Sequence, residues 1–131
     1  MSTVDGAPML RRIGQIAIRI MDLDRAVALY RDVLGLRFLF QAPPGLAFFD
    51  CGGVRLMLSR GEAGEFDHPA SILYFDVADI HAAHEGLGAR GVAFRESPHI
   101  VADLGDRVLW LAAFEDGEGN VFCLMSEKAK A

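Results

Sequence analysis

The sequence predicts an α+β fold made of two tandem βαβββ modules, whose curved mixed β-sheets form a cleft flanked by helices. One observation is that the same order of elements occurs twice, about 57 residues apart, with residues 13–20 and 71–77 as the two leading strands. A second is that Asp22 and Asp79 follow these strands in the position of a helix N-cap. Two copies of one small unit can pack around a shared cleft, so corresponding positions are expected to face each other across it.

Module one is expected over residues 12–60. Its first strand alternates isoleucines with other residues, so the isoleucines face one side and Gln15 the other. After Asp22, apolar residues at helical spacing predict a helix that ends at Gly35. The remaining strands are expected at 36–41, 46–50 and 54–59.

Residues 61–70 carry acidic residues, glycines and a proline, and are expected to link the modules. Module two is expected over 71–126, with a helix from Asp79 to about Arg90 that its internal glycines weaken. Residues 97–106 are expected to form a longer connection, and the chain beyond 126 a frayed tail. The other predicted strands are 72–77, 92–96, 107–114 and 121–126. Residues 1–131 are therefore expected to be a single domain.

Composition excludes several classes of protein. Apolar residues make up 52% of the chain, which is ample for a packed core, and the formal net charge is -5. A nucleic-acid partner is not expected, because phosphate binding requires a basic face. No stretch approaches the roughly 20 apolar residues that span a bilayer, so no membrane partner is expected. Two cysteines form neither a disulfide framework nor a zinc motif, and no secretory signal begins the sequence, so a cytoplasmic protein is expected.

Four segments carry a resemblance to a known family. They are Asp22-Leu23-Asp24-Arg25-Ala26, residues 28–36, Gly52-Gly53-Val54-Arg55-Leu56-Met57-Leu58 and the turn Asp116-Gly117-Glu118-Gly119-Asn120. In this order they resemble the vicinal-oxygen-chelate superfamily of glyoxalases, bleomycin resistance proteins and extradiol dioxygenases. The resemblance covers nearly the whole chain and implies the fold. It leaves function open, because the fold hosts isomerases, lyases, dioxygenases and drug-binding proteins.

The resemblance also indicates where metal ligands would lie. Family members that use a metal place a ligand on the first and last strand of each module, which here are the positions of Gln15, Met57, Ile72 and Cys123. None of the four is a histidine or a carboxylate, the donors that a hard divalent cation prefers. The sequence therefore predicts no metal, no other cofactor and a metal-free cleft.

The favoured hypothesis is binding of a small hydrophobic or aromatic molecule in this cleft, without a metal. The expected lining residues are Gln15, Met57, Ile72, Tyr74 and Cys123, with Phe48 and Trp110 as further walls. Gln15 would orient the ligand by a hydrogen bond. The resemblance implies a homodimer, in which either one chain closes a cleft alone or two chains exchange modules to build two.

Two other hypotheses stay open. His99 is the best candidate for a general base, so a lyase, isomerase or dioxygenase-type enzyme is the alternative, with His99 or a non-standard metal site as its centre. His81 and His84 are three residues apart on a helix, a spacing that can hold a metal on one helix face. The ordinary interpretation of this pair is a solvated helix face. The third hypothesis is a structural module whose cleft is filled by its own side chains.

Overall fold

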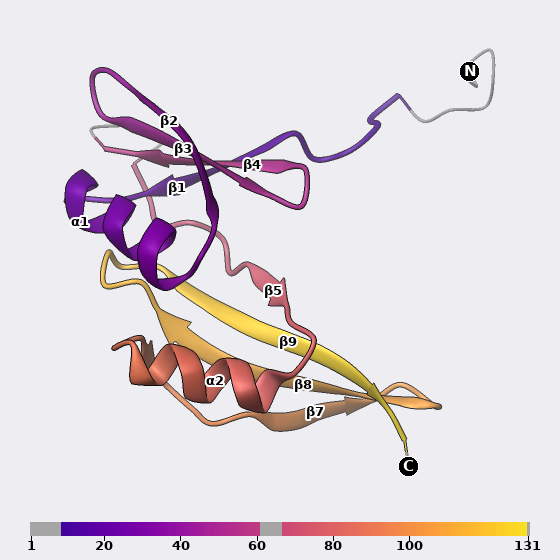
Figure 1. The fold of residues 1–131 in the computed structure, drawn as a ribbon. Helices are drawn as coiled ribbons and strands as arrows, with labels where there is room; N and C mark the ends of the chain where they lie inside the picture. Colours follow the sequence, from indigo (N-terminus) through magenta and orange to yellow (C-terminus); the bar gives the residue numbers. More distant parts are fainter. Residues whose placement is uncertain (1–8, 61–66, 131) are drawn as a thin grey trace.

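The computed structural model describes residues 9–60 and 67–130. Module one consists of β1 (Gln15–Arg19), α1 (Leu23–Ala28), the π-helical turn η1 (Leu29–Val33), β2 (Arg37–Ala42), β3 (Leu46–Cys51) and β4 (Val54–Ser59). Module two consists of β5 (Tyr74–Asp76), α2 (Ile80–Ala89), β6 (Ala93–Phe94), β7 (His99–Asp103), β8 (Arg107–Glu115) and β9 (Val121–Ala129). The predicted α+β class and doubled element order are confirmed (Figure 1). No helix within the described ranges is long and apolar enough to cross a bilayer.

The two modules have the same strand order. In the first sheet the order is β1-β4-β3-β2, and in the second it is β5-β9-β8-β6, with β7 also paired to β8. The first strand of each module pairs in parallel with the last, and the other pairs are antiparallel. A helix therefore connects the first strand to the far edge of its own sheet in each copy.

Local sequence explains where the helices begin and where the first one ends. The Asp22 carboxylate accepts a hydrogen bond from the Arg25 N–H at 3.1 Å, and Asp79 accepts one from the Ala82 N–H at 3.1 Å. Each carboxylate satisfies a backbone donor that the first helical turn leaves without a partner. After η1 the chain reverses at Gly35, whose φ of 76° is strained for residues with a β-carbon.

The predicted irregular connection at 97–106 is wrong, because β7 lies within it. β7 and the two-residue β6 both pair with β8, so together they occupy the place that β2 has in module one. Both outer strands are irregular at similar places: β2 has a register shift between Phe38 and Phe40, and β7 has one between Ile100 and Ala102. Pro98 lies between β6 and β7, where it removes a backbone donor and interrupts the strand.

The predicted frayed tail is also wrong. β9 continues to Ala129, which lies opposite Arg107 in the β8–β9 ladder, and the Lys130 N–H donates to the Asp106 carbonyl at 2.9 Å. Backbone pairing thus extends three residues beyond the predicted strand. Of the predicted linker, residues 61–66 lie outside the described residues.

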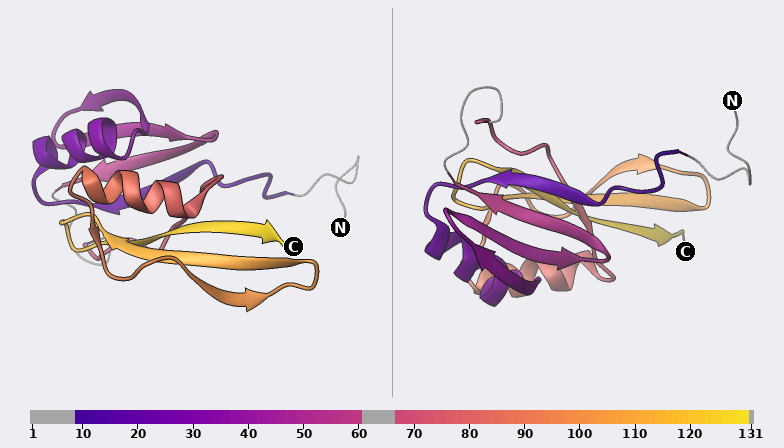
Figure 2. Two further views of the ribbon diagram at one scale, coloured as in Figure 1. Left: turned by 60° about the horizontal axis from the view of Figure 1, so that its bottom comes forward. Right: turned by 90° about the horizontal axis from the view of Figure 1, so that it is seen from above.

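A single hydrophobic core joins the modules through their helix-facing sides. Its largest fully buried rings are Tyr30, Phe49, Phe114 and Phe122. Figure 2 shows α1 and α2 beside each other, and the Arg90 guanidinium of module two donates to the Val33 carbonyl of module one at 3.0 Å. The sheet faces turned away from this core, called the outer faces below, are left for other contacts.

Glu118, in the turn between β8 and β9, links module two to the start of α1. Its side chain is fully buried and accepts hydrogen bonds from the backbone N–H groups of Met21 and Asp22. The Arg25 guanidinium donates to the second carboxylate oxygen and forms an ion pair with it. A buried carboxylate with donors on both oxygens is compensated for its loss of water.

Asp116 and Asn120 flank Glu118 in the same turn. Asp116 accepts a hydrogen bond of 2.7 Å from the buried Tyr30 hydroxyl, and the Asn120 amide donates to the Arg19 carbonyl at 2.8 Å. The polar joint, meaning Asp116, Glu118, Asn120 and their partners, therefore fixes module two against both β1 and α1.

Candidate functional site

The outer face of module one carries a connected cluster around Arg55. The Arg55 Nε donates to the Gln15 Oε1 at 2.6 Å, and the Gln15 amide nitrogen lies 3.6 Å from the Met57 sulfur. Phe48 lies directly opposite Met57 in the β3–β4 ladder, so both side chains emerge on the same face. Three of the residues predicted to line a ligand site, Gln15, Phe48 and Met57, are thus brought together.

Aromatic rings complete this cluster. The Arg55 guanidinium carbon lies 5.1 Å from the centre of the Phe48 ring, within the range of a cation–π contact. Phe40 from β2 stacks on the same ring with a centroid distance of 4.6 Å, and it remains 47% exposed. The face therefore presents a guanidinium held in place by an amide and an aromatic ring, beside an exposed aromatic surface. Phe40 was missed as a site residue, because alternation alone would place it on the same face as Phe38, and only the register shift between the two turns Phe40 to the outer face.

The outer face of module two carries the other predicted lining residues. Tyr74 lies opposite Cys123 in the parallel β5–β9 ladder, and Tyr74 is 53% exposed. Ile72, also 53% exposed, lies two residues before Tyr74 and just outside β5. Burial raises the pKa of the Cys123 thiol, and the nearby charge of Glu96 raises it further, so the thiol is protonated at neutral pH. It is a small apolar group rather than a nucleophile or a thiolate ligand.

His99 lies on the same outer face. It pairs with Leu111 of β8, and Leu111 pairs in turn with Met125 of β9. Met125 and Cys123 are two residues apart on β9, so His99 lies on the same side of the sheet as Cys123. The His99 Nε2 lies 3.9 Å from the Glu96 carboxylate, and its Nδ1 is 3.0 Å from the Ser97 carbonyl. An imidazole beside a carboxylate is thus available at an exposed position.

Trp110 and the two helical histidines lie elsewhere. Trp110 shares its side of β8 with the buried Ala112 and Phe114, so it faces α2 rather than the outer face. Its ring contacts His81 edge-on at a centroid distance of 4.8 Å, while His84 packs on Phe94 at 4.4 Å. The two histidines therefore contact different aromatic rings instead of converging on one point.

The four positions at which the resemblance would place metal ligands do not fit a hard cation. Gln15 already binds Arg55, Met57 offers a thioether, Ile72 offers no donor, and Cys123 is a protonated thiol. Throughout the part of the chain that the structure describes, no three His, Cys, Asp or Glu side chains gather as a metal site would require. A positive guanidinium beside the Gln15 position further opposes a cation there.

These four positions, Gln15, Met57, Ile72 and Cys123, also lie in two separate groups. Described contacts join Gln15 to Met57 in module one, and Cys123 to the Leu73 carbonyl in module two, but none joins the first group to the second. Each outer face lies on the opposite side of its sheet from the shared core. A cleft lined by both faces therefore needs a second chain, or a different arrangement of the modules in one chain.

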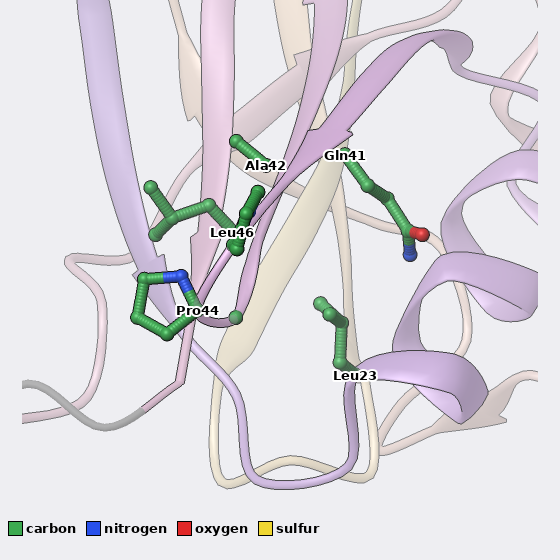
Figure 3. A pocket seen from close by; sticks show the side chains of 7 residues that line it. Leu23, Gln41, Ala42, Pro44 and Leu46 are labelled. Carbon is green, nitrogen blue, oxygen red and sulfur yellow. The ribbon is translucent and has the colours of Figure 1, made fainter.

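Two hollows lie away from the Arg55 cluster. One of about 260 Å³ lies at the β2–β3 turn, and Figure 3 shows Leu23 at the start of α1 across from Pro44 and Leu46. Its lining, as far as the described residues form it, carries no charged group and no candidate for catalysis. The other, of about 450 Å³, lies between the modules beside β5 and is taken up below.

Comparison with solved structures shows the same fold. A member of the glyoxalase/bleomycin resistance protein/dioxygenase superfamily from Sphaerobacter thermophilus is 20% identical, with a TM-score of 0.72 over 91% of this chain and 99% of that one. A lactoylglutathione lyase from Agrobacterium tumefaciens is 23% identical, with a TM-score of 0.67 over 91% and 94% of the two chains. A glyoxalase/bleomycin resistance protein/dioxygenase from Nocardioides is 22% identical, with a TM-score of 0.67 over 88% and 82%. These identities establish the fold alone.

Sequence comparison assigns the family. No curated protein matches this chain. The family model of the Glyoxalase/Bleomycin resistance protein/Dioxygenase superfamily matches residues 12–124, which is most of both modules. The chain therefore belongs to the glyoxalase/bleomycin resistance protein/dioxygenase superfamily.

Proposed function

We propose that this protein binds a small hydrophobic or aromatic molecule, without a metal, on the outer faces of its sheets. The observation that carries the proposal is the arrangement of Arg55, held by Gln15 and by the Phe48 ring. This cluster lies where metal-dependent members of the family are expected to bind a cation. A fixed positive group beside exposed aromatic rings is suited to a ligand, not to a metal ion.

The cluster also defines the ligand's chemistry. Nε of Arg55 is occupied by Gln15, which leaves the other guanidinium nitrogens for a carboxylate or another acceptor. Phe40 and Met57 supply apolar surface next to it. The ligand best matched to this face is an aromatic molecule with one anionic or strongly accepting group.

A homodimer would complete the site. No described contact joins the two outer faces of one chain, so we expect a cleft lined by Gln15 and Met57 on one side and Tyr74 and Cys123 on the other to be built with module two of a second chain. Two chains related by a twofold axis would then build two identical clefts. Both cysteines are free thiols, which supports a cytoplasmic setting.

Replacing Arg55 with alanine is expected to weaken ligand binding by about tenfold to a hundredfold, because a charge-assisted hydrogen bond contributes about 1.5–3 kcal/mol. Ligands would first be found by a thermal-shift screen of aromatic carboxylates and neutral aromatic compounds, since binding raises the melting temperature. Affinities would then be measured by calorimetry. Arg31→Ala is the matched control, because Arg31 is paired with Asp32 on η1. Equal losses in both variants, or no hit in the screen, would contradict the proposal.

Mixing two binding-deficient variants would test the exchanged dimer. Arg55→Ala alters module one and Tyr74→Ala alters module two, so each homodimer has two damaged clefts. After joint refolding, mixed dimers would carry one intact cleft, and about a quarter of all sites should bind normally. Sedimentation would establish that dimers form. A stable monomer, or a mixture that recovers no binding, would show that the cleft is not shared between chains.

His99 supports a second candidate function. Its position beside Glu96 on the outer face of module two is suited to proton transfer next to a carbonyl, as in a lyase or isomerase. This alternative predicts turnover of a carbonyl compound that His99→Ala abolishes while binding persists. Metal analysis of protein purified without a histidine tag would separate the two functions, because stoichiometric metal that is lost in His99→Ala would favour the enzyme.

A further inference from the structure

Backbone pairing fixes which positions of the two modules correspond. The Ile20 N–H donates to the Ser59 carbonyl at 3.0 Å, and the Val77 N–H donates to the Met125 carbonyl at 2.9 Å. These bonds close the parallel ladders of β1–β4 and β5–β9 at equivalent places. The β3–β4 turn of module one therefore corresponds to the β8–β9 turn of module two, which carries the polar joint.

The two corresponding turns meet the opposite module in different ways. The β8–β9 turn reaches β1 and α1 with Glu118, whose buried carboxylate fills the space. The β3–β4 turn approaches the end of β5 with Cys51 and Gly52, both of which line the cavity there. By the same correspondence, the backbone of Ala78 and Asp79 takes the place of Met21 and Asp22, and neither Cys51 nor Gly52 offers a carboxylate to it.

The partners of the polar joint are also replaced on the second side. Leu87 of α2 corresponds to Tyr30 of η1, and Ala82 corresponds to Arg25. At this second contact, the hydrogen-bonding side chains of the polar joint are thus replaced by apolar side chains or by none. A cavity of about 450 Å³ is left where the other joint is filled.

The cavity wall is mainly apolar and partly aromatic. Leu34 and Leu36 contribute from module one, and Phe75, Leu87, Phe114 and Leu124 contribute from module two. Burial and the charge of Asp50 raise the pKa of the Cys51 thiol, so this group is neutral at pH 7. A volume of several hundred Å³ with such a lining is typical of sites for small organic ligands.

Two features favour a ligand with a hydrogen-bond donor. Asp76 also lines the cavity, and none of the arginines, lysines and histidines that the structure describes does. In addition, β5 is at the end of its sheet, and the ladder directs the backbone groups of Phe75 to β9. Carbonyl oxygens of Tyr74 and Asp76 therefore point to the free edge, beside the cavity.

We propose that this cavity between the modules is a second binding site, which takes a neutral or cationic aromatic molecule of two or three rings with an N–H donor. This cavity differs from the site on the outer faces in its location and in its charge, because Arg55 on the outer face favours a ligand with a hydrogen-bond acceptor. The two sites share Tyr74, which lines this cavity and also lies on the outer face of module two, and they differ in their other residues.

The test is fluorescence titration of the full chain with N-phenyl-1-naphthylamine, a neutral probe with one N–H group. Saturable binding to the unaltered protein is expected. Cys51→Phe would fill part of the cavity and weaken binding by about tenfold or more. Leu104→Phe adds an aromatic ring at an exposed position of the β7–β8 turn and should change affinity less than about twofold. Absence of saturable binding, or equal affinity in Cys51→Phe, would overturn the proposal.

Two further measurements keep the result independent of how well Cys51→Phe folds. In the unaltered protein, the probe should shift the methyl signals of Leu34, Leu87 and Leu124, and unshifted signals would overturn the proposal. Arg55→Ala should bind the probe as the unaltered protein does. If Arg55→Ala loses the probe instead, the probe binds to the outer face, and the second site is disproved without affecting the proposed function.

Discussion

Replacing Asp116 with alanine is expected to lower the free energy of unfolding by about 4 kcal/mol. The carboxylate is buried and accepts hydrogen bonds from the Tyr30 hydroxyl at 2.7 Å, the Glu118 N–H at 2.7 Å, and the Asn120 N–H and Nδ2 at 3.1 and 2.7 Å. Alanine removes the acceptor, so these buried donors lose their hydrogen-bond partner. Each such group costs about 1–3 kcal/mol, and relaxation of the turn recovers a part.

Equilibrium unfolding in urea would measure this effect. Tyr30→Phe removes only one donor and is expected to cost about 1 kcal/mol, since Asp116 keeps its other donors. Burial, followed by the charge of Asp116, raises the pKa of Tyr30 far above its ordinary value, so the hydroxyl remains a donor at any pH used. Asp106→Ala, at an exposed position, should stay within about 0.5 kcal/mol of the original protein. A cost for Asp116→Ala no larger than that of Tyr30→Phe would contradict the role given to the polar joint.

Replacing Glu118 with alanine is expected to cost about 3 kcal/mol at pH 7. The substitution removes the acceptor for the N–H groups of Met21 and Asp22 and also leaves a cavity at a fully buried position. Arg25 loses its partner but its side chain is 57% exposed, so water can solvate the guanidinium and the penalty stays below that of a buried orphan charge. Chemical denaturation at constant pH would measure the difference.

Glu118→Gln isolates the contribution of the charge. Burial alone would raise the pKa of Glu118, but hydrogen bonds from Arg25, Met21 and Asp22 outweigh it and hold the pKa below the ordinary value of 4.5. The folded state therefore favours the carboxylate. Its contribution is fully present above pH 4.5 and is lost as the pH falls through the lower pKa of the folded state. The stability difference between the original protein and Glu118→Gln should shrink between pH 6 and about pH 3, and a constant difference would disprove the charge effect.

The fold could be predicted because local signals repeat. Both N-cap aspartates precede their helices as predicted, and Gly35 ends the first one. β7 was missed because its residues follow Pro98 and lie before an acidic turn, while its strand conformation depends on pairing with β8. Glu127 and Lys128 near the end of β9 are charged, and they are held by the long β8 strand opposite them rather than by their own propensity.

The candidate site could be predicted only in part. Alternation along β8 divides its residues into two sets, but it does not say which set faces α2, and Trp110 proved to lie with Phe114. The role proposed for Arg55 depends on its contacts with Gln15 and Phe48. Gln15 is 40 residues away in the sequence, and it comes close only because β1 pairs with β4 in the folded sheet. Whether the two outer faces meet is a property of how the modules pack, and no single strand encodes it.

The register shifts in β2 and β7 have a consequence for self-association. An irregular outer strand is a poor template for another chain, because its free backbone groups do not match a regular partner. At the opposite ends of the sheets, the β1 and β5 ladders contain no such shift. Aggregation by strand addition is thus blunted at the outer edges, and any orderly growth of the sheets is directed to the edges formed by β1 and β5.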